Sequence, residues 1–311
     1  MAGTAATLLA VLLWSFHATI GDLTVQNISP MQLTVKAYLL SSVLLVLLAG
    51  MSRTPVSSCL RDLGKPLFLA LCASGPVMML YYLALYQGMS KAPAVDVYII
   101  HYLWPVFAAL FIKMFLGRTW GHKGLLSWLF MLMSFAGAGI VIMGGGSSVL
   151  GSGSFTGYAM AAVSAVCGGL YLPSLVAAGD KLTRIGYAEH AGFLMPYLIL
   201  IAAGLVSLAV MSPAGTWQAN LQAGSLTGTL FVGLGIIVAA EMAWVLGVRW
   251  NRSQSTAALA YLTPVFSTIL LIFISKEHVH PHSVLGIALI VGANILMQKT
   301  RKAGHAGRYT S

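Results

Sequence analysis

The stretch VYIIHYLWPVFAALFIKMFL, residues 97–116, is as long and apolar as a membrane span, yet it contains a proline at position 105. About 20 consecutive apolar residues are needed to cross roughly 30 Å of hydrocarbon as a helix. Nearly the same phrase returns in ALAYLTPVFSTILLIFI, residues 258–274, with a proline at position 264. A helix breaker at the same place in two apolar runs indicates a membrane protein built from a repeated unit.

The composition supports a membrane protein and argues against a soluble one. Hydrophobic residues make up 58% of the chain and charged residues only 8%, whereas a soluble domain carries about 25% charged residues. We therefore predict an all-α membrane protein with ten transmembrane helices at residues 4–20, 31–50, 67–88, 94–115, 124–143, 155–178, 187–211, 224–248, 255–275 and 282–298.

The net charge of +10 is explained by topology. With a cytoplasmic N-terminus, 14 of the 17 Lys and Arg residues fall on the cytoplasmic side, because only Lys91 and Lys276 face outward and Lys36 lies within a span. This is the positive-inside pattern. It predicts a multi-pass protein with both termini in the cytoplasm and with anionic membrane lipids as partners of its basic loops. This distribution of charge does not favour nucleic acid as a partner.

The second half of the chain repeats the first with an offset of 159 residues, which aligns Tyr102 with Tyr261 and Pro105 with Pro264. Each half holds five predicted spans, an odd number, so the second must enter the membrane inverted. Inverted repeats with a substrate site at their interface are typical of secondary transporters. The predicted domains are a first repeat at 1–146, a Gly/Ser linker at 147–153, a second repeat at 154–300 and a basic cytoplasmic tail at 301–311.

The two prolines have a specific backbone consequence. Because proline has no N–H group, Pro105 deprives the His101 carbonyl of its helical donor, and Pro264 does the same to Ala260. In hydrocarbon such a carbonyl needs another partner, so both could accept a hydrogen bond from a substrate ammonium group. Alternatively, each proline only kinks its helix for packing.

Glu241 is the one carboxylate of seven that lies well inside a predicted span. An acid within a membrane is a candidate for binding an ammonium group or for relaying protons. The alternative is a structural ion pair with Arg249.

Several aromatic side chains lie deeper in the predicted spans than interfacial anchoring requires. Together they suit flat, amphipathic solutes, although Tyr and Trp in membranes are often interfacial anchors. No cofactor and no metal site is predicted. The substrate-binding residues predicted in this way are Trp14, His17, Tyr82, Tyr98, His101, Trp104, Pro105, Tyr171, Glu241, Trp244 and Pro264.

This combination resembles the EamA-type members of the drug/metabolite transporter superfamily. The motifs YLWP at 102–105 and YLTPVFS at 261–267, with Trp14-Ser15, are similar to those of the bacterial aromatic amino acid exporters of the YddG type. The resemblance implies a basket-like fold in the bacterial inner membrane and the export of amino acids, aromatic and other neutral ones, and related metabolites. It also adds Tyr261, the counterpart of Tyr102, to the predicted substrate-binding residues. Thr263 stands where the first half has Trp104, so the two halves differ at the expected aromatic wall.

Other functions are less consistent with the sequence. Proton-coupled efflux of other small metabolites or drugs is the main alternative. An intramembrane enzyme requires paired carboxylates, a metal cluster or a nucleophile with its base, and neither the HExxH nor the GxSxG motif occurs. A channel is a third alternative, without a repeated filter motif. The spacing of Gly224 and Gly228 allows close helix packing within a monomer or between two chains, so a monomer is plausible and the oligomeric state stays open.

Overall fold

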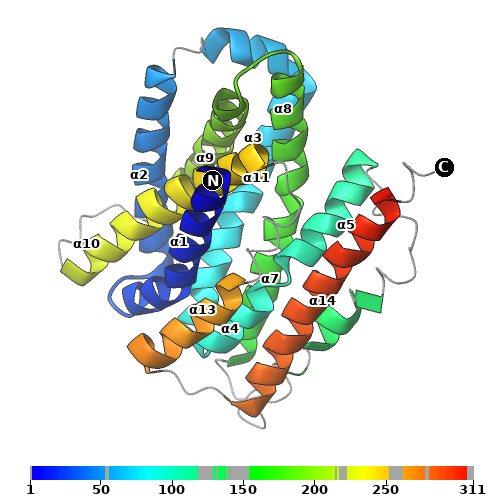
Figure 1. Cartoon of the computed structure of the whole chain (residues 1–311). Coiled ribbons are helices and arrows are strands. Elements are labelled where there is room, and N and C mark those ends of the chain that lie inside the picture. Colours follow the sequence, from blue (N-terminus) through cyan, green and yellow to red (C-terminus); the bar gives the residue numbers. More distant parts are fainter. Residues whose placement is uncertain are drawn as a thin grey trace.

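The chain forms helices throughout the residues that the computed structural model describes, which are 2–52, 56–117, 129–130, 132–137, 140, 154–213, 216, 223–251, 262–276 and 280–306. These helices lie side by side in a bundle (Figure 1). In chain order they are α1 (Ala2–Val25), α2 (Pro30–Met51), α3 (Val56–Met89), α4 (Ala94–His101), α5 (Trp104–Leu116), α7 (Ser154–Leu170), α8 (Leu172–Arg184), α9 (Glu189–Met211), α10 (Ala223–Leu230), the π-helical η2 (Phe231–Ala240), α11 (Glu241–Asn251), α13 (Leu262–Leu270), the π-helical η4 (Leu271–Ser275) and α14 (Pro281–Ala306).

Seven of the predicted spans correspond to helical stretches long and apolar enough to cross a membrane: Ala2–Val25, Pro30–Met51, Val56–Met89, Ala94–Leu116, Phe155–Arg184, Gly192–Met211 and Gly224–Gly247. Two further spans correspond to shorter apolar helices, Leu262–Ser275 and Pro281–Ala293. Most of the predicted span 124–143 and the predicted linker 147–153 lie outside the described residues. The count of ten and the division into two repeats therefore stay predictions.

Helix α3 begins well before the predicted start of its span at residue 67. Its first part ends at Gly64, whose φ of 73° only glycine adopts readily, and the chain then resumes as a helix. The Lys181 ammonium of α8 donates to the Leu63 carbonyl at 3.0 Å. A cation at a helix C-terminus is favourable, so α8 stabilises this bend in α3.

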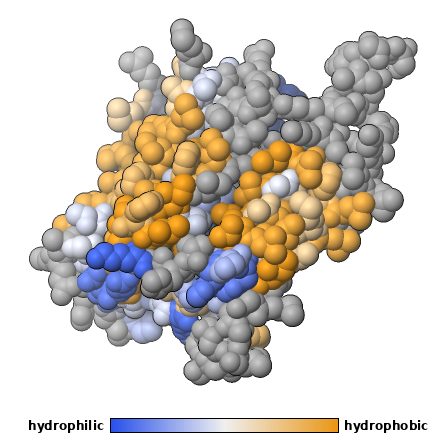
Figure 2. All heavy atoms as spheres, turned by 60° about the horizontal axis from the view of Figure 1, so that its bottom comes forward, coloured by the Kyte–Doolittle hydropathy of each residue, from blue (hydrophilic) through white to orange (hydrophobic). Residues whose placement is uncertain are grey.

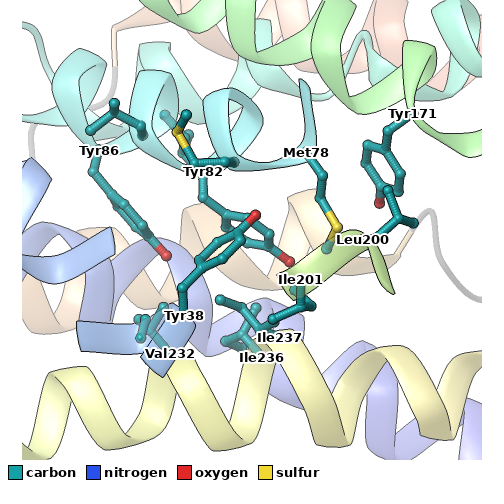
Figure 3. Packing of buried hydrophobic residues seen from close by; sticks show 14 of the residues in the cluster. Tyr38, Met78, Tyr82, Tyr86, Tyr171, Leu200, Ile201, Val232, Ile236 and Ile237 are labelled. Atoms are coloured by element: carbon teal, nitrogen blue, oxygen red, sulfur yellow. The ribbon is translucent and has the colours of Figure 1, made fainter. Parts of the chain in front are cut away.

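Helices α3 and α9 pack with their backbones in contact. A Cβ atom on Gly75 of α3 would lie 2.5 Å from the Ala203 side chain and 2.6 Å from the Leu200 carbonyl oxygen. A Cβ atom on Gly204 of α9 would likewise lie 2.7 Å from the ring of Tyr38. Small residues allow such close approach of membrane helices, where van der Waals contact replaces the hydrophobic effect as the driving force. Buried tyrosines of α2 and α3 fill the adjoining core (Figure 3).

Of the two glycines with this spacing, Gly224 and Gly228, the second allows close packing of two helices within the chain. A Cβ atom on Gly228 would collide with Thr24, so α10 lies directly against α1.

A carboxylate holds three helices together away from the cavity that is described below. Asp96 of α4 is 3% exposed and accepts hydrogen bonds from the Tyr158 hydroxyl of α7 at 3.0 Å and from the Ser283 hydroxyl of α14 at 2.6 Å. Both carboxylate oxygens are therefore satisfied by neutral donors, and α4 is joined to two helices that lie far from it in sequence.

The face of the molecule seen in Figure 2 carries large hydrophobic areas, with hydrophilic residues in separate patches. Val43, Val206 and Phe273, for example, are 60%, 65% and 78% exposed. Side chains of this kind are tolerated on such a scale where the surrounding solvent is lipid. Together with the span-length helices, this surface is that of a multi-pass membrane protein.

Candidate functional site

The site is built around the break between α4 and α5. The Val106 amide donates to the Leu103 carbonyl at 2.9 Å, three residues back, and the Phe107 amide donates to the same carbonyl at 3.3 Å. In a continuous α-helix the Val106 amide would bind the Tyr102 carbonyl. Since Pro105 also has no N–H group, the carbonyls of His101 and Tyr102 both lose their usual helical donors, as the sequence predicts for His101.

This break opens onto a cavity of about 370 Å³, which is within the range for small-molecule sites. Its lining is aromatic and comes from both halves of the sequence. Eleven of the twelve predicted site residues line it, namely Trp14, His17, Tyr82, Tyr98, His101, Trp104, Pro105, Tyr171, Glu241, Trp244 and Pro264. The twelfth, Tyr261, lies outside the described residues. Their role in binding stays a prediction.

Sequence reasoning missed several residues of the lining, chiefly Tyr81, Tyr102, Asp180 and Phe193. Tyr81 directly precedes Tyr82, and on a straight helix adjacent residues point about 100° apart. Both residues nevertheless line the cavity. Their ring centroids lie 4.7 Å apart, and the ring planes make an angle of 80°. The adjacency of two deep tyrosines in α3 was the signal available for finding Tyr81.

His101 links two helices through its two ring nitrogens. Its Nε2 atom lies 3.2 Å from the Tyr81 hydroxyl, and its Nδ1 atom lies 2.9 Å from the Ser164 hydroxyl of α7. The Ser164 hydroxyl in turn donates to the Tyr81 backbone carbonyl at 2.6 Å. His101 and Ser164 are 3% and 0% exposed, whereas Tyr81 is only partly buried and faces the cavity.

His17 of α1 makes a similar pair of contacts. Its Nε2 atom lies 2.7 Å from the Tyr86 hydroxyl, and its Nδ1 atom lies 3.4 Å from the Tyr98 hydroxyl. The Tyr98 hydroxyl donates to the Trp14 carbonyl at 3.2 Å. Both predicted histidines are thus held in hydrogen bonds with neutral groups, which agrees with buried, uncharged imidazoles.

The carboxyl group of Glu241 is the main electrostatic feature of the cavity. It lies in the same cavity lining as the rings of Tyr81, Tyr82 and Tyr171. Within the described residues it has neither a hydrogen-bond donor nor a cation as partner. The Arg249 side chain, the alternative partner, is not among those described.

Glu241 owes its position to an irregular helix. It follows directly after the ten-residue π-helical segment η2 and begins α11. A π-helical segment changes the direction of the residues that follow it and is frequent at functional sites. Three residues on, Trp244 packs against Trp14 of α1 with ring centroids 5.3 Å apart, so the same segment also positions an aromatic wall.

The lining contains two acids, Glu241 and Asp180, and neither Lys nor Arg is among the described residues that form it. The carboxylate of Glu241, for which the described residues supply no cation, therefore favours a cationic group in the cavity. Among the described residues, no three His, Cys, Asp or Glu side chains come close enough together to hold a metal ion.

Comparison with known proteins agrees with this architecture. Residues 1–143 match the model of the EamA-like transporter family. The match covers slightly less than half of the chain and shows that this part is similar to that family, which belongs to the drug/metabolite transporter superfamily.

A solved structure described as "Crystal structure of protein" resembles this chain with a TM-score of 0.58 at 21% sequence identity. The likeness covers 94% of this chain and 95% of the other, and it shows that the fold is shared along the whole length. A comparison with curated proteins found no match.

Proposed function

We propose that the protein exports amino acids, aromatic and other neutral ones, together with related metabolites, across the bacterial inner membrane. In this proposal the two halves are inverted repeats that alternate access to the cavity between them, and both termini lie in the cytoplasm. The observation that carries the proposal is an aromatic cavity, lined from both halves, that contains the carboxyl group of Glu241. A transporter role fits the family.

The shape and chemistry of the cavity favour an amino acid over other metabolites. Its volume of about 370 Å³ suits a small solute, and its walls offer the faces of Trp14, Trp104 and Trp244 for stacking. The acids favour a solute with an amine and disfavour an anion such as a phosphorylated metabolite.

Each end of an amino acid then has a complementary group. The ammonium group pairs with Glu241 and with the carbonyls of His101 and Tyr102, which Pro105 leaves without their helical donors. Tryptophan N–H groups in the wall are hydrogen-bond donors for the carboxylate. The nonpolar or aromatic side chain packs against the rings. Neutral amino acids satisfy all three contacts.

Transport into proteoliposomes tests the proposal. Purified protein in liposomes should take up labelled phenylalanine and tryptophan, and also threonine and methionine, faster than empty vesicles do. Labelled glutamate, an anion of similar size, should be a poor substrate. Absence of flux above empty vesicles for every neutral amino acid would defeat the proposal. The same assay with and without an imposed pH gradient distinguishes proton-coupled export from facilitated diffusion.

A further inference from the structure

The hydrogen bonds around His101 determine which way the Tyr81 hydroxyl presents itself to the cavity. The Ser164 hydroxyl has a single proton and lies 2.6 Å from the Tyr81 carbonyl oxygen, which can only accept. At this distance the proton of Ser164 must lie between the two oxygens. Ser164 therefore has no proton left to donate to His101 and must accept one from it.

This fixes the tautomer of the imidazole. The Nδ1 atom of His101, 2.9 Å from the Ser164 oxygen, carries the proton. In the neutral ring the Nε2 atom is then an acceptor, and the Tyr81 hydroxyl 3.2 Å away must donate to it. A doubly protonated ring would place a positive charge in a 3%-exposed position whose partners are both neutral, which is costly.

The Tyr81 hydroxyl consequently donates its proton to His101, and its oxygen can accept a hydrogen bond from a ligand in the cavity. We propose that His101 is a positioning residue that holds Tyr81 in this state, and that Tyr81 and Glu241 together form a subsite for a primary ammonium group. The inference rests on the proposed function, because the ligand is the solute of the same cavity.

The chemical class of the ligand follows from what the subsite offers. Tyr81 supplies an acceptor and Glu241 supplies acceptors with a negative charge, and both residues line the same cavity of about 370 Å³. A primary ammonium has three donors and a positive charge, so it satisfies both groups at once. A hydroxyl in its place has one donor and no charge.

The test compares two ligands that differ only at this position: L-phenylalanine and L-phenyllactate, which has a hydroxyl in place of the ammonium. Binding to the purified protein is followed by tryptophan fluorescence, since Trp14, Trp104 and Trp244 line the cavity. The wild type should prefer phenylalanine by about tenfold or more, the range expected for one hydrogen bond to a charged group.

Two variants remove the proposed orientation by different routes. Tyr81→Phe deletes the hydroxyl, and His101→Asn keeps a donor for Ser164 but has no acceptor that reaches Tyr81. Each should lower the preference for phenylalanine by about tenfold. His101→Gln, whose amide oxygen reaches the former Nε2 position, should restore most of it. Tyr187→Phe, the same change in a loop away from the cavity, should leave it as in the wild type.

A purely structural role of His101 predicts a different result. Loosened packing would weaken both ligands equally and leave their ratio unchanged. An unchanged ratio in Tyr81→Phe and His101→Asn, or a wild type that does not distinguish the ligands, would overturn the inference. Selective binding without flux in proteoliposomes would instead support the subsite and contradict the export proposal.

Discussion

Glu241→Gln separates the binding role of this carboxyl group from a structural one, because the two roles predict changes of opposite sign. The variant keeps the shape of the side chain and removes its charge. Within the described residues Glu241 has no hydrogen-bond donor or cation to lose. A structural ion pair, by contrast, would leave its cation without a partner.

The size of the effect on binding follows from a charge-assisted hydrogen bond. Such a bond contributes about 1.5–3 kcal/mol, so substrate affinity should fall about 10- to 150-fold. The empty protein should be at least as stable as the wild type, since removing an unpartnered acid from a membrane interior relieves a desolvation cost.

Two measurements on the same preparation check this pair of effects. The KM for phenylalanine uptake in proteoliposomes should rise, while the melting temperature without substrate should be unchanged or higher. A KM equal to that of the wild type together with a melting temperature several degrees lower would refute the reasoning. That result would assign Glu241 to the scaffold.

Three further predictions concern the scaffold. Gly75→Ala places a Cβ atom 2.6 Å from an α9 backbone oxygen. The overpacking should destabilise the fold by about 1–3 kcal/mol, while the higher helix propensity of alanine stabilises it by about 1 kcal/mol. The matched Gly50→Ala, with open space around it, should not lower the melting temperature. Asp96→Asn leaves one of two buried hydroxyl donors without an acceptor and should cost about 1–3 kcal/mol in thermal unfolding; a melting temperature equal to that of the wild type would contradict this. The pKa of the Tyr187 hydroxyl is raised to about 12 because it donates a hydrogen bond to Asp62. The contribution of this bond to the free energy of unfolding should therefore be complete below pH about 10 and be lost as the pH rises through about 12. An ultraviolet difference titration against Tyr187→Phe should show that higher midpoint, and a midpoint near 10 would contradict it.

Most of the residues that the sequence singled out line one cavity, because they were chosen by the backbone chemistry of proline and by the scarcity of deep acids. A proline in an apolar run must interrupt the hydrogen-bond ladder, and the break at Pro105 lies at the cavity wall. A single deep acid among apolar residues must face something polar, and Glu241 does face the cavity. Neither inference requires the arrangement of the helices to be known.

The parts that sequence reasoning missed depend on contacts between distant segments. Tyr81 was not among the predicted site residues, and only the packing of α3 against α4 brings its hydroxyl to His101. Asp96 lies two residues from the start of the predicted span 94–115, yet it is buried and bonded to Tyr158 and Ser283. The π-helical segment before Glu241 has no proline to mark it and contains only Gly233 and Gly235 as weaker helix breakers.

Binding of the solute within the aromatic cavity is tested most directly by protection from alkylation. Val176 lines the cavity, so Val176→Cys in a protein whose three native cysteines are replaced should react with a maleimide more slowly when phenylalanine is present. Ile185→Cys, exposed beyond the end of α8, should react at the same rate with and without phenylalanine. An equal rate at Val176→Cys with saturating phenylalanine would contradict binding in this cavity.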